Sequence, residues 1–92
     1  MEKTRLRVVV QGRVQGVGFR YFTQRTAQML DLAGWVRNRA DGTVEAELEG
    51  DACAVEAALD SLRRGPAGAT VENMKIEKQP CSKNCQSFEI RL

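Results

Sequence analysis

The segment Gln11-Gly12-Arg13-Val14-Gln15-Gly16-Val17-Gly18-Phe19-Arg20 joins an apolar run to a helix-like run, and the rest of the chain can be placed from it. The preceding residues 6–11 alternate around a β-branched centre, which predicts a strand buried on both faces. The closely spaced glycines then predict a loop whose backbone amides are free to face an anion. Arg20 follows at the expected start of a helix, where a cation opposes the helix dipole unless an anion lies between them. The segment therefore predicts a strand, an anion-binding loop and a helix.

The helix after the loop is expected over residues 20–31. Its apolar positions recur at steps of three and four residues, which predicts one apolar stripe: Phe22, Thr26, Met29 and Leu30. Gly34 follows and is expected to end the helix near Ala33.

A β-hairpin is predicted over residues 34–49, with Asp41-Gly42 as its turn signal. A two-residue turn would place Arg37 and Arg39 on the apolar face of the hairpin. A three-residue loop over residues 40–42, with Gly42 left-handed in a bulge, avoids this.

The three-residue loop sets the orientation of Asn38. It pairs Val36 with Ala46 and Asn38 with Val44, so that Asn38 points to the core-facing side near the end of its strand.

A second helix is expected to begin at the N-cap Asp51 and to end at Gly65-Pro66. Its predicted inward residues are Val55, Ala58, Leu59 and Leu62. Residues 71–78 predict a strand with Met74 and Ile76 inward, residues 79–86 a polar loop, and Phe88, Ile90 and Leu92 a short last strand.

The order of elements is β-α-β-β-α-β with an added C-terminal strand, which predicts an α+β, ferredoxin-like sandwich with both helices on one face of a mixed sheet. A right-handed crossover makes the first two strands parallel, with the third antiparallel between them. The ends of the first two strands then share one edge of the sheet. We therefore expect Arg20 and Asn38 to face the same cavity.

Length and composition fit one domain over residues 1–92, because the chain has 92 residues with 42% hydrophobic and 28% charged residues. The charged start does not resemble a signal peptide, and no run is long enough to span a membrane, so we expect a cytoplasmic protein. Residues 1–39 contain 8 Lys and Arg against 2 Asp and Glu, a charge of +6. This favours a small anionic ligand over nucleic acid, which more often meets a wider basic face.

Histidine is absent, which excludes the commonest general base and half of the usual zinc chemistry. Cys53 lies in a helical pattern and is expected in the core. Cys81 and Cys85 are expected to be free thiols in a loop, although their spacing would allow a disulfide on oxidation. With so few ligands we expect no metal site.

Two stretches, residues 12–20 and residues 34–45 (Gly34-Trp35-Val36-Arg37-Asn38-Arg39-Ala40-Asp41-Gly42-Thr43-Val44-Glu45), resemble both signature stretches of the acylphosphatases. The resemblance runs from the first strand to the last and includes the Gly65-Pro66 break. It implies hydrolysis of the carboxyl-phosphate bond of small acylphosphates to a carboxylate and inorganic phosphate, without metal or cofactor.

The resemblance also implies roles for residues of the two stretches. Arg20 would hold two phosphoryl oxygens, and Asn38 would orient the attacking water, while the substrate's own phosphate takes the proton. Further phosphate contacts would come from the loop amides of Gln15, Gly16, Val17, Gly18 and Phe19. The Gln15 side chain is expected to bond the loop to itself, and Arg37 and Arg39 either to add positive potential at the mouth or to pair with Glu45 and its neighbours.

Two other functions remain open on the sequence. An RNA-binding module of this fold needs exposed aromatic residues on its first and third strands, and these strands have none. A domain of a larger carbamoyl-transfer protein is the second alternative. The start at Met1 and the end after the last strand favour a stand-alone enzyme, expected to be a monomer.

Overall fold

The structure is a computed structural model that describes residues 2–82 and 87–92. Along the chain its elements are β1 (Lys3–Arg13), α1 (Phe19–Met29), β2 (Ala33–Asn38), β3 (Val44–Asp51), α2 (Ala52–Arg64), β4 (Thr70–Gln79) and β5 (Phe88–Arg91). β1 is longer than the six residues expected, because polar and charged residues continue the strand beyond its apolar centre at both ends.

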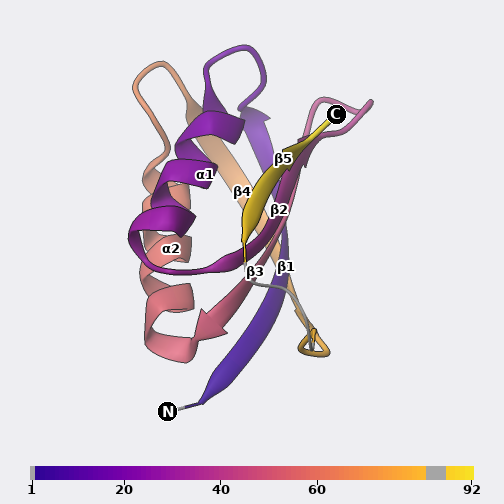
Figure 1. Ribbon diagram of the computed structural model, residues 1–92. Helices are drawn as coiled ribbons and strands as arrows, with labels where there is room; N and C mark the ends of the chain where they lie inside the picture. The colour runs from indigo at the N-terminus through magenta and orange to yellow at the C-terminus, as the bar shows by residue number, and fades with distance from the viewer. Residues whose placement is uncertain (1, 83–86) are drawn as a thin grey trace.

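The strands form one sheet in the order β4-β1-β3-β2-β5, and both helices cover the same face of it (Figure 1). β3 lies between β1 and β2 and runs antiparallel to both. β4 is antiparallel to β1, and β5 is parallel to β2, so the sheet is mixed. The α+β ferredoxin-like prediction is therefore confirmed. The loop after β1, the β2–β3 hairpin and the C-terminus all lie at one end of the molecule (Figure 1).

The core lies between the sheet and the two helices. The four inward residues predicted for α2 are each at most 2% exposed, and the Asp51 carboxylate caps the helix by accepting a hydrogen bond from the Cys53 amide at 2.9 Å. From the sheet, alternate side chains of β1, β2 and β3 join them, including Val8, Val10 and Val36. This packing of apolar side chains holds the ends of the strands in fixed positions.

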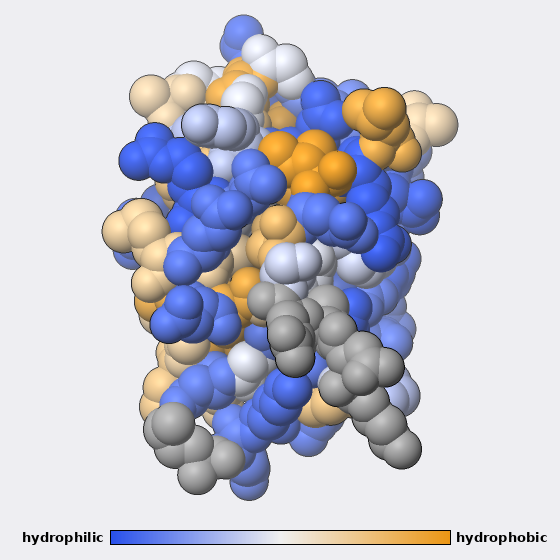
Figure 2. All heavy atoms as spheres, viewed as in Figure 1, coloured by the Kyte–Doolittle hydropathy of each residue, from blue (hydrophilic) through white to orange (hydrophobic). Residues whose placement is uncertain are grey.

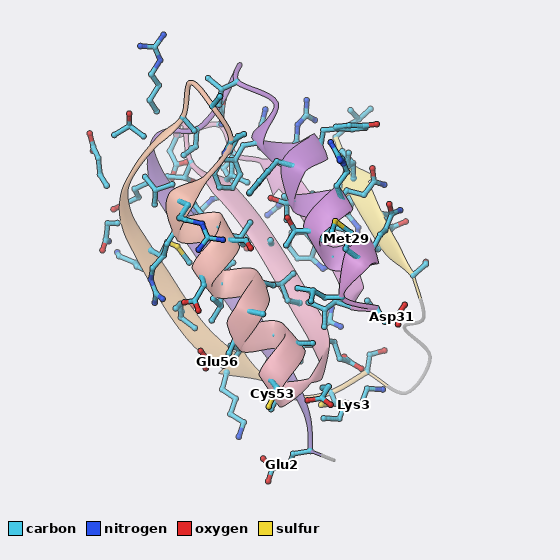
Figure 3. The ribbon with its side chains drawn as sticks, turned by 90° about the vertical axis from the view of Figure 1, so that its left-hand side faces the viewer. Glu2, Lys3, Met29, Asp31, Cys53 and Glu56 are labelled. Atoms are coloured by element: carbon cyan, nitrogen blue, oxygen red, sulfur yellow. The ribbon has the colours of Figure 1, made fainter. Side chains whose placement is uncertain are left out.

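The apolar stripe of α1 differs from the prediction. The buried residues are Phe19, Thr23 and Ala27, at steps of four residues, while Met29 is 80% exposed on the outside of the helix (Figure 3). α1 begins one residue earlier and ends at Met29, so the turn after it leads directly into β2. The prediction that Met29 faces inward was wrong, although Phe22 and Leu30 do pack against the core.

Three other predicted core or strand positions are exposed. Cys53 is exposed in the first turn of α2 (Figure 3), Ile76 is 38% exposed on the edge strand β4, and Leu92 lies beyond β5. All three lie at element ends or sheet edges, where few neighbours cover a side chain. The Cys81 thiol is free and exposed, whereas Cys85 and half of the predicted polar loop lie outside the described residues.

Neither helix found in residues 2–82 and 87–92 is long and apolar enough to cross a membrane.

Candidate active site

The hairpin has the predicted register, which places Asn38 at the end of β2. Val36 pairs with Ala46 and Asn38 pairs with Val44. Gly42 has a φ of 91° in the three-residue loop, as expected for a left-handed bulge residue. Asn38 therefore lies on the helix-facing side of the sheet, at the end where β1 leads into the glycine loop.

The loop between β1 and α1 exposes its backbone. Gly16 and Gly18 have φ values of 76° and 78°, in the left-handed region that favours glycine. A Cβ atom built on either residue would meet no atom within 4 Å. The space above the loop is open, so a ligand can approach the peptide groups directly.

The N-terminus of α1 has unsatisfied donors. Gly18 is its N-cap and supplies no side-chain hydrogen bond, and the first turn has no acidic residue. None of the turn and loop hydrogen bonds within residues 2–82 and 87–92 is donated by the amides of residues 16–21, and the amides of a first turn have no partner within the helix. The N-terminus of α2, in contrast, is capped by Asp51. Only the α1 end is therefore open to an anion.

Arg20 and Asn38 line the same cavity, as the topology predicted. The cavity has a volume of about 350 Å³ and also borders Gly16 and Gly18. Both polar side chains are half-buried. The cavity therefore combines a guanidinium, a side-chain amide and the exposed loop backbone.

Arg20 and Asn38 have no polar partners within the part of the chain that the structure describes. No carboxylate forms an ion pair with Arg20 there. Neither residue is found among the side-chain hydrogen bonds of these residues, and neither has a further interaction. Half-buried donors that line a cavity without protein partners are available to a ligand or to water. Their arrangement fits a site that binds an anion and a water.

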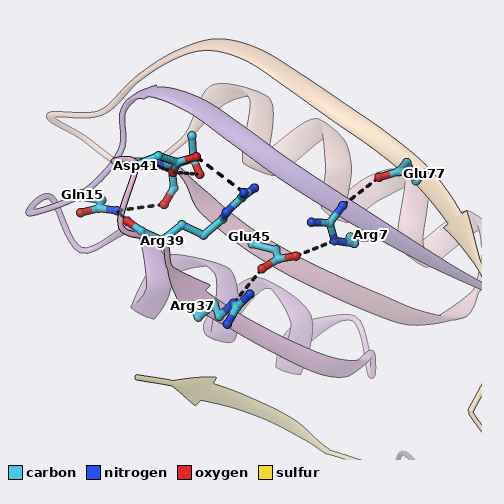
Figure 4. Close-up of polar contacts among 8 residues, drawn as sticks. Arg7, Gln15, Arg37, Arg39, Asp41, Glu45 and Glu77 are labelled. Atoms are coloured by element: carbon cyan, nitrogen blue, oxygen red, sulfur yellow. Dashed lines mark hydrogen bonds and ion pairs between the residues drawn. The ribbon is translucent and has the colours of Figure 1, made fainter.

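Three side chains of the loop serve packing and anchoring. Phe19 is 2% exposed in the core, and Val17 packs against it. The Gln15 amide nitrogen donates to the carbonyl oxygens of Arg39 at 2.7 Å and Thr43 at 2.9 Å (Figure 4). The expectation that Gln15 bonds the loop to itself was wrong, because its side chain reaches the hairpin. These residues can offer only their backbone amides to a ligand.

Four further residues line the cavity that sequence reasoning did not assign to it: Val14, Tyr21, Ile90 and Leu92. The alternation of residues 88–92 predicted the last strand, but not that it pairs with β2 and so reaches the cavity. Apolar surface gathers over β5, near the C-terminus (Figure 2). One wall of the cavity is therefore apolar.

Arg37 and Arg39 face the opposite side of the sheet. Arg37 Nε lies 2.7 Å from Glu45 Oε1, and Arg39 Nη2 lies 3.7 Å from Asp41 Oδ2 (Figure 4). Burial raises the pKa of Glu45, but hydrogen bonds from Arg37 and Arg7 lower that pKa by more, so it lies below its ordinary value. The positive charge of Arg37 is therefore used in pairing.

Within residues 2–82 and 87–92, no group of three or more His, Cys, Asp or Glu side chains is arranged so that it could hold a metal ion.

Comparison with known proteins relates this site to one family. The Acylphosphatase family model matches residues 6–90. An acylphosphatase of Syntrophotalea carbinolica is 46% identical over 92 residues, all of both chains. The crystal structure of acylphosphatase from Bacillus subtilis has a TM-score of 0.93 and 37% identity, covering 97% of this chain and 99% of that one.

The same fold also occurs within a larger protein. Full-length HypF, solved in a phosphate- and nucleotide-bound form, matches with a TM-score of 0.86 and 25% identity over 98% of this chain but only 12% of its own. The family match over residues 6–90 and the relative aligned along its whole length decide the assignment. The chain belongs to the acylphosphatase family.

Proposed function

We propose that Arg20, the loop amides and Asn38 together hydrolyse the carboxyl-phosphate bond of small acylphosphates. The observation that supports this most directly is the shared cavity, in which an unpaired arginine and an unpaired asparagine meet the open backbone of the glycine loop. The activity is that of the family, and the roles of the individual residues are our proposal.

The phosphoryl group binds at the N-terminus of α1. The planar guanidinium of Arg20 holds two of its oxygens in a bidentate contact. Amides of residues 15–19 donate to the third oxygen, aided by the helix dipole. Because these donors are fixed before the reaction, they stabilise charge that develops on the phosphoryl oxygens without reorganisation.

Asn38 positions the attacking water opposite the leaving group. Its side-chain oxygen accepts a hydrogen bond from the water, which then attacks phosphorus. The bond from phosphorus to the acyl oxygen breaks, and its electron pair leaves with the carboxylate. The proton of the water passes to the phosphate, so one water and one acylphosphate give one carboxylate and one dihydrogen phosphate. The apolar wall near Tyr21 and Ile90 offers a surface for the acyl group.

The remaining properties are proposals of the same kind. Residues 1–92 act as one domain and as a monomer, since every group invoked here lies on one chain. The proposed location is the cytoplasm. The reaction needs no metal or cofactor, so hydrolysis is expected to continue unchanged in excess EDTA. RNA is not a partner, and a filter-binding titration at low salt is expected to show no salt-dependent affinity.

Benzoyl phosphate hydrolysis by the purified protein tests the proposal. We expect turnover far above the spontaneous rate, with inorganic phosphate as a competitive inhibitor. The substitution Asn38→Ala should lower kcat by about 100-fold or more, because the water loses its orientation, and should leave the inhibition constant of phosphate nearly unchanged. Arg20→Ala should impair both quantities.

Two matched controls remove the same groups away from the cavity. Arg25→Ala removes an exposed arginine from the same helix, and Asn73→Ala removes an exposed asparagine from β4. Both should keep wild-type kinetics. Wild-type turnover in Asn38→Ala or in Arg20→Ala would refute the assigned roles.

A further inference from the structure

The Gln15 side chain connects the two halves of the site. Its Nε2 atom donates to Arg39 O at 2.7 Å and to Thr43 O at 2.9 Å. A glutamine amide has two N–H donors, and both are used here. The opposite orientation would place the side-chain oxygen against two carbonyl oxygens, so the contact specifies one orientation of the amide.

The two acceptors form the neck of the hairpin loop. Arg39 N donates to Thr43 O at 2.9 Å, and Gly42 N donates to Arg39 O at 3.2 Å. The Asp41 carboxylate accepts from the Thr43 amide at 3.0 Å and from its hydroxyl at 2.6 Å. The loop is therefore closed by hydrogen bonds of its own, and Gln15 binds it at its base.

Asn38 is directly attached to this neck. It precedes Arg39 in the chain and pairs with Val44, the residue after Thr43. A displacement of the neck relative to the glycine loop would therefore displace Asn38 relative to the phosphate site.

No other hydrogen bond joins residues 14–18 to residues 38–44 in the described part of the chain. The ladder between β1 and β3 ends at Val10 and Val44, and beyond that point β1 pairs only with β4. The backbone of the glycine loop is thus not joined to the hairpin by the sheet. Gln15 supplies the direct link.

We propose that Gln15 is a positioning residue whose side chain sets the separation between the phosphate cradle and the water-orienting Asn38. It touches neither the phosphate nor the water with its side chain. This inference rests on the function proposed above, since it concerns how the two halves of that site are aligned. A misplacement on the order of 1 Å can lower a rate by about 100-fold, which is the sensitivity that such a link exploits.

The substitution Gln15→Met tests the link, because methionine has a similar shape but no donors. We expect kcat for benzoyl phosphate to fall by about 10- to 100-fold, while the inhibition constant of phosphate stays within about twofold, since Arg20 and the loop amides remain. Gln15→Asn keeps the amide but is one methylene shorter and cannot reach both carbonyls. It is measured in parallel and should show the same split between kcat and phosphate binding, so a folding defect of either variant leaves the other as a test.

Gln11→Met is the matched control. Gln11 lies on β1 and accepts a hydrogen bond from Asn73 at 3.1 Å, away from the cavity. The same substitution there also removes one side-chain contact of a glutamine, and it should leave kcat and phosphate inhibition unchanged.

A double-mutant cycle with Asn38→Ala separates positioning from general structural support. If Gln15 acts through Asn38, Gln15→Met should have almost no effect on kcat in the Asn38→Ala background. Equal fold-losses in both backgrounds, or a loss of phosphate affinity as large as the loss of kcat, would overturn the positioning role. Wild-type turnover in Asn38→Ala alone would instead overturn the proposed function, so the two failures are distinguishable.

Discussion

Two regions of the molecule differ in the partners of their arginine side chains. One is the open face of the sheet, which the helices do not cover. The other is the loop end of the molecule, formed by residues 14–20 and 38–43. On the open face, Arg5, Arg7 and Arg37 each lie 2.5–2.7 Å from a glutamate of β3. At the loop end, Arg20 has no acidic partner among the described residues. The arginines of the open face are thus paired with carboxylates, whereas Arg20 has none among the described residues, which supports our proposal that its partner is an anion.

Two glutamates of the open face are deeply buried for charged groups. Glu45 is 3% exposed and Glu49 is 1% exposed. Glu49 Oε1 accepts from Arg5 at 2.8 Å and from the Ser82 amide at 2.8 Å, and its Oε2 lies 3.1 Å from Lys3 Nζ, so its charge is paired although that oxygen has no well-aligned hydrogen bond. Burial without these partners would favour the neutral acids.

The largest effect is expected when a carboxylate is introduced near Arg20, so that the loop end resembles the open face in having an acidic side chain near its arginine. Asn38→Asp places a carboxylate in the cavity with Arg20, where it pairs with the guanidinium and repels phosphate. We expect kcat/KM for benzoyl phosphate to fall by about 1000-fold and phosphate inhibition to weaken. The melting temperature should be maintained or raised, because Arg20 gains a partner.

The control for this change is Asn73→Asp on β4, which should leave kcat/KM unchanged. A stable Asn38→Asp protein that binds phosphate like the wild type would show that Arg20 does not bind the anion.

The next largest effect is expected when an arginine of the open face is removed. This change should lower the stability of the protein and leave its turnover unchanged. Arg7 Nε lies 2.5 Å from Glu45 and its Nη1 lies 2.8 Å from Glu77. Arg7→Met leaves the buried Glu45 with Arg37 as its remaining cation, so urea unfolding should show a loss of about 2–3 kcal/mol. Turnover per folded molecule should not change.

Arg63→Met is the matched control for this change, since Arg63 pairs with Asp60 at 3.4 Å between two exposed side chains. Arg63→Met should lower the free energy of unfolding by less than about 0.5 kcal/mol. Equal losses in the two variants would mean that burial of Glu45 does not matter.

The sequence predicted the parts of the fold that follow from local patterns. The register of the hairpin followed from keeping Arg37 off the apolar face, and the end of α2 followed from Gly65-Pro66. The meeting of Arg20 and Asn38 followed from the handedness of the crossover. In each case one alternative would have buried a charge or broken a steric rule.

The sequence did not predict features that depend on long-range neighbours. Met29 continues an apolar periodicity but is exposed, because the side of α1 that faces the sheet is set by Phe19 and Ala27. Gln15 could donate to any nearby carbonyl, and only the folded hairpin specifies which. Ile90 reaches the cavity because β5 pairs with β2 in parallel, a choice that no local pattern encodes.

Acid should weaken the open face before it affects the contacts of the core. Burial alone would raise the pKa of Glu45 and of Glu49. Hydrogen bonds and nearby cations outweigh this effect, so that both pKa values lie below the ordinary value of 4.5. A lowered folded-state pKa contributes stability that is complete above that ordinary value and is lost as pH falls through the folded-state pKa. The free energy of unfolding of the wild type should therefore fall steeply below pH 4.5, and less steeply in Glu45→Gln. Identical pH profiles would contradict the contribution of Glu45.

The smallest effect concerns the N-termini of the two helices. The N-terminus of α2 is capped by a carboxylate, whereas the N-terminus of α1 is not. Asp51→Ala removes the cap of α2 and should lower stability by about 1 kcal/mol in urea unfolding, whereas Asp60→Ala, a control near the other end of the same helix, should change it little. Inorganic phosphate should stabilise the wild type by occupying the uncapped end of α1. Because the two helix N-termini lie at opposite ends of the molecule (Figure 1), saturating phosphate should add the same increment of stability to Asp51→Ala as to the wild type. A larger increment in that variant would mean that phosphate also binds at the uncapped N-terminus of α2, so that an uncapped helix end is enough to bind the anion and Arg20 is not required.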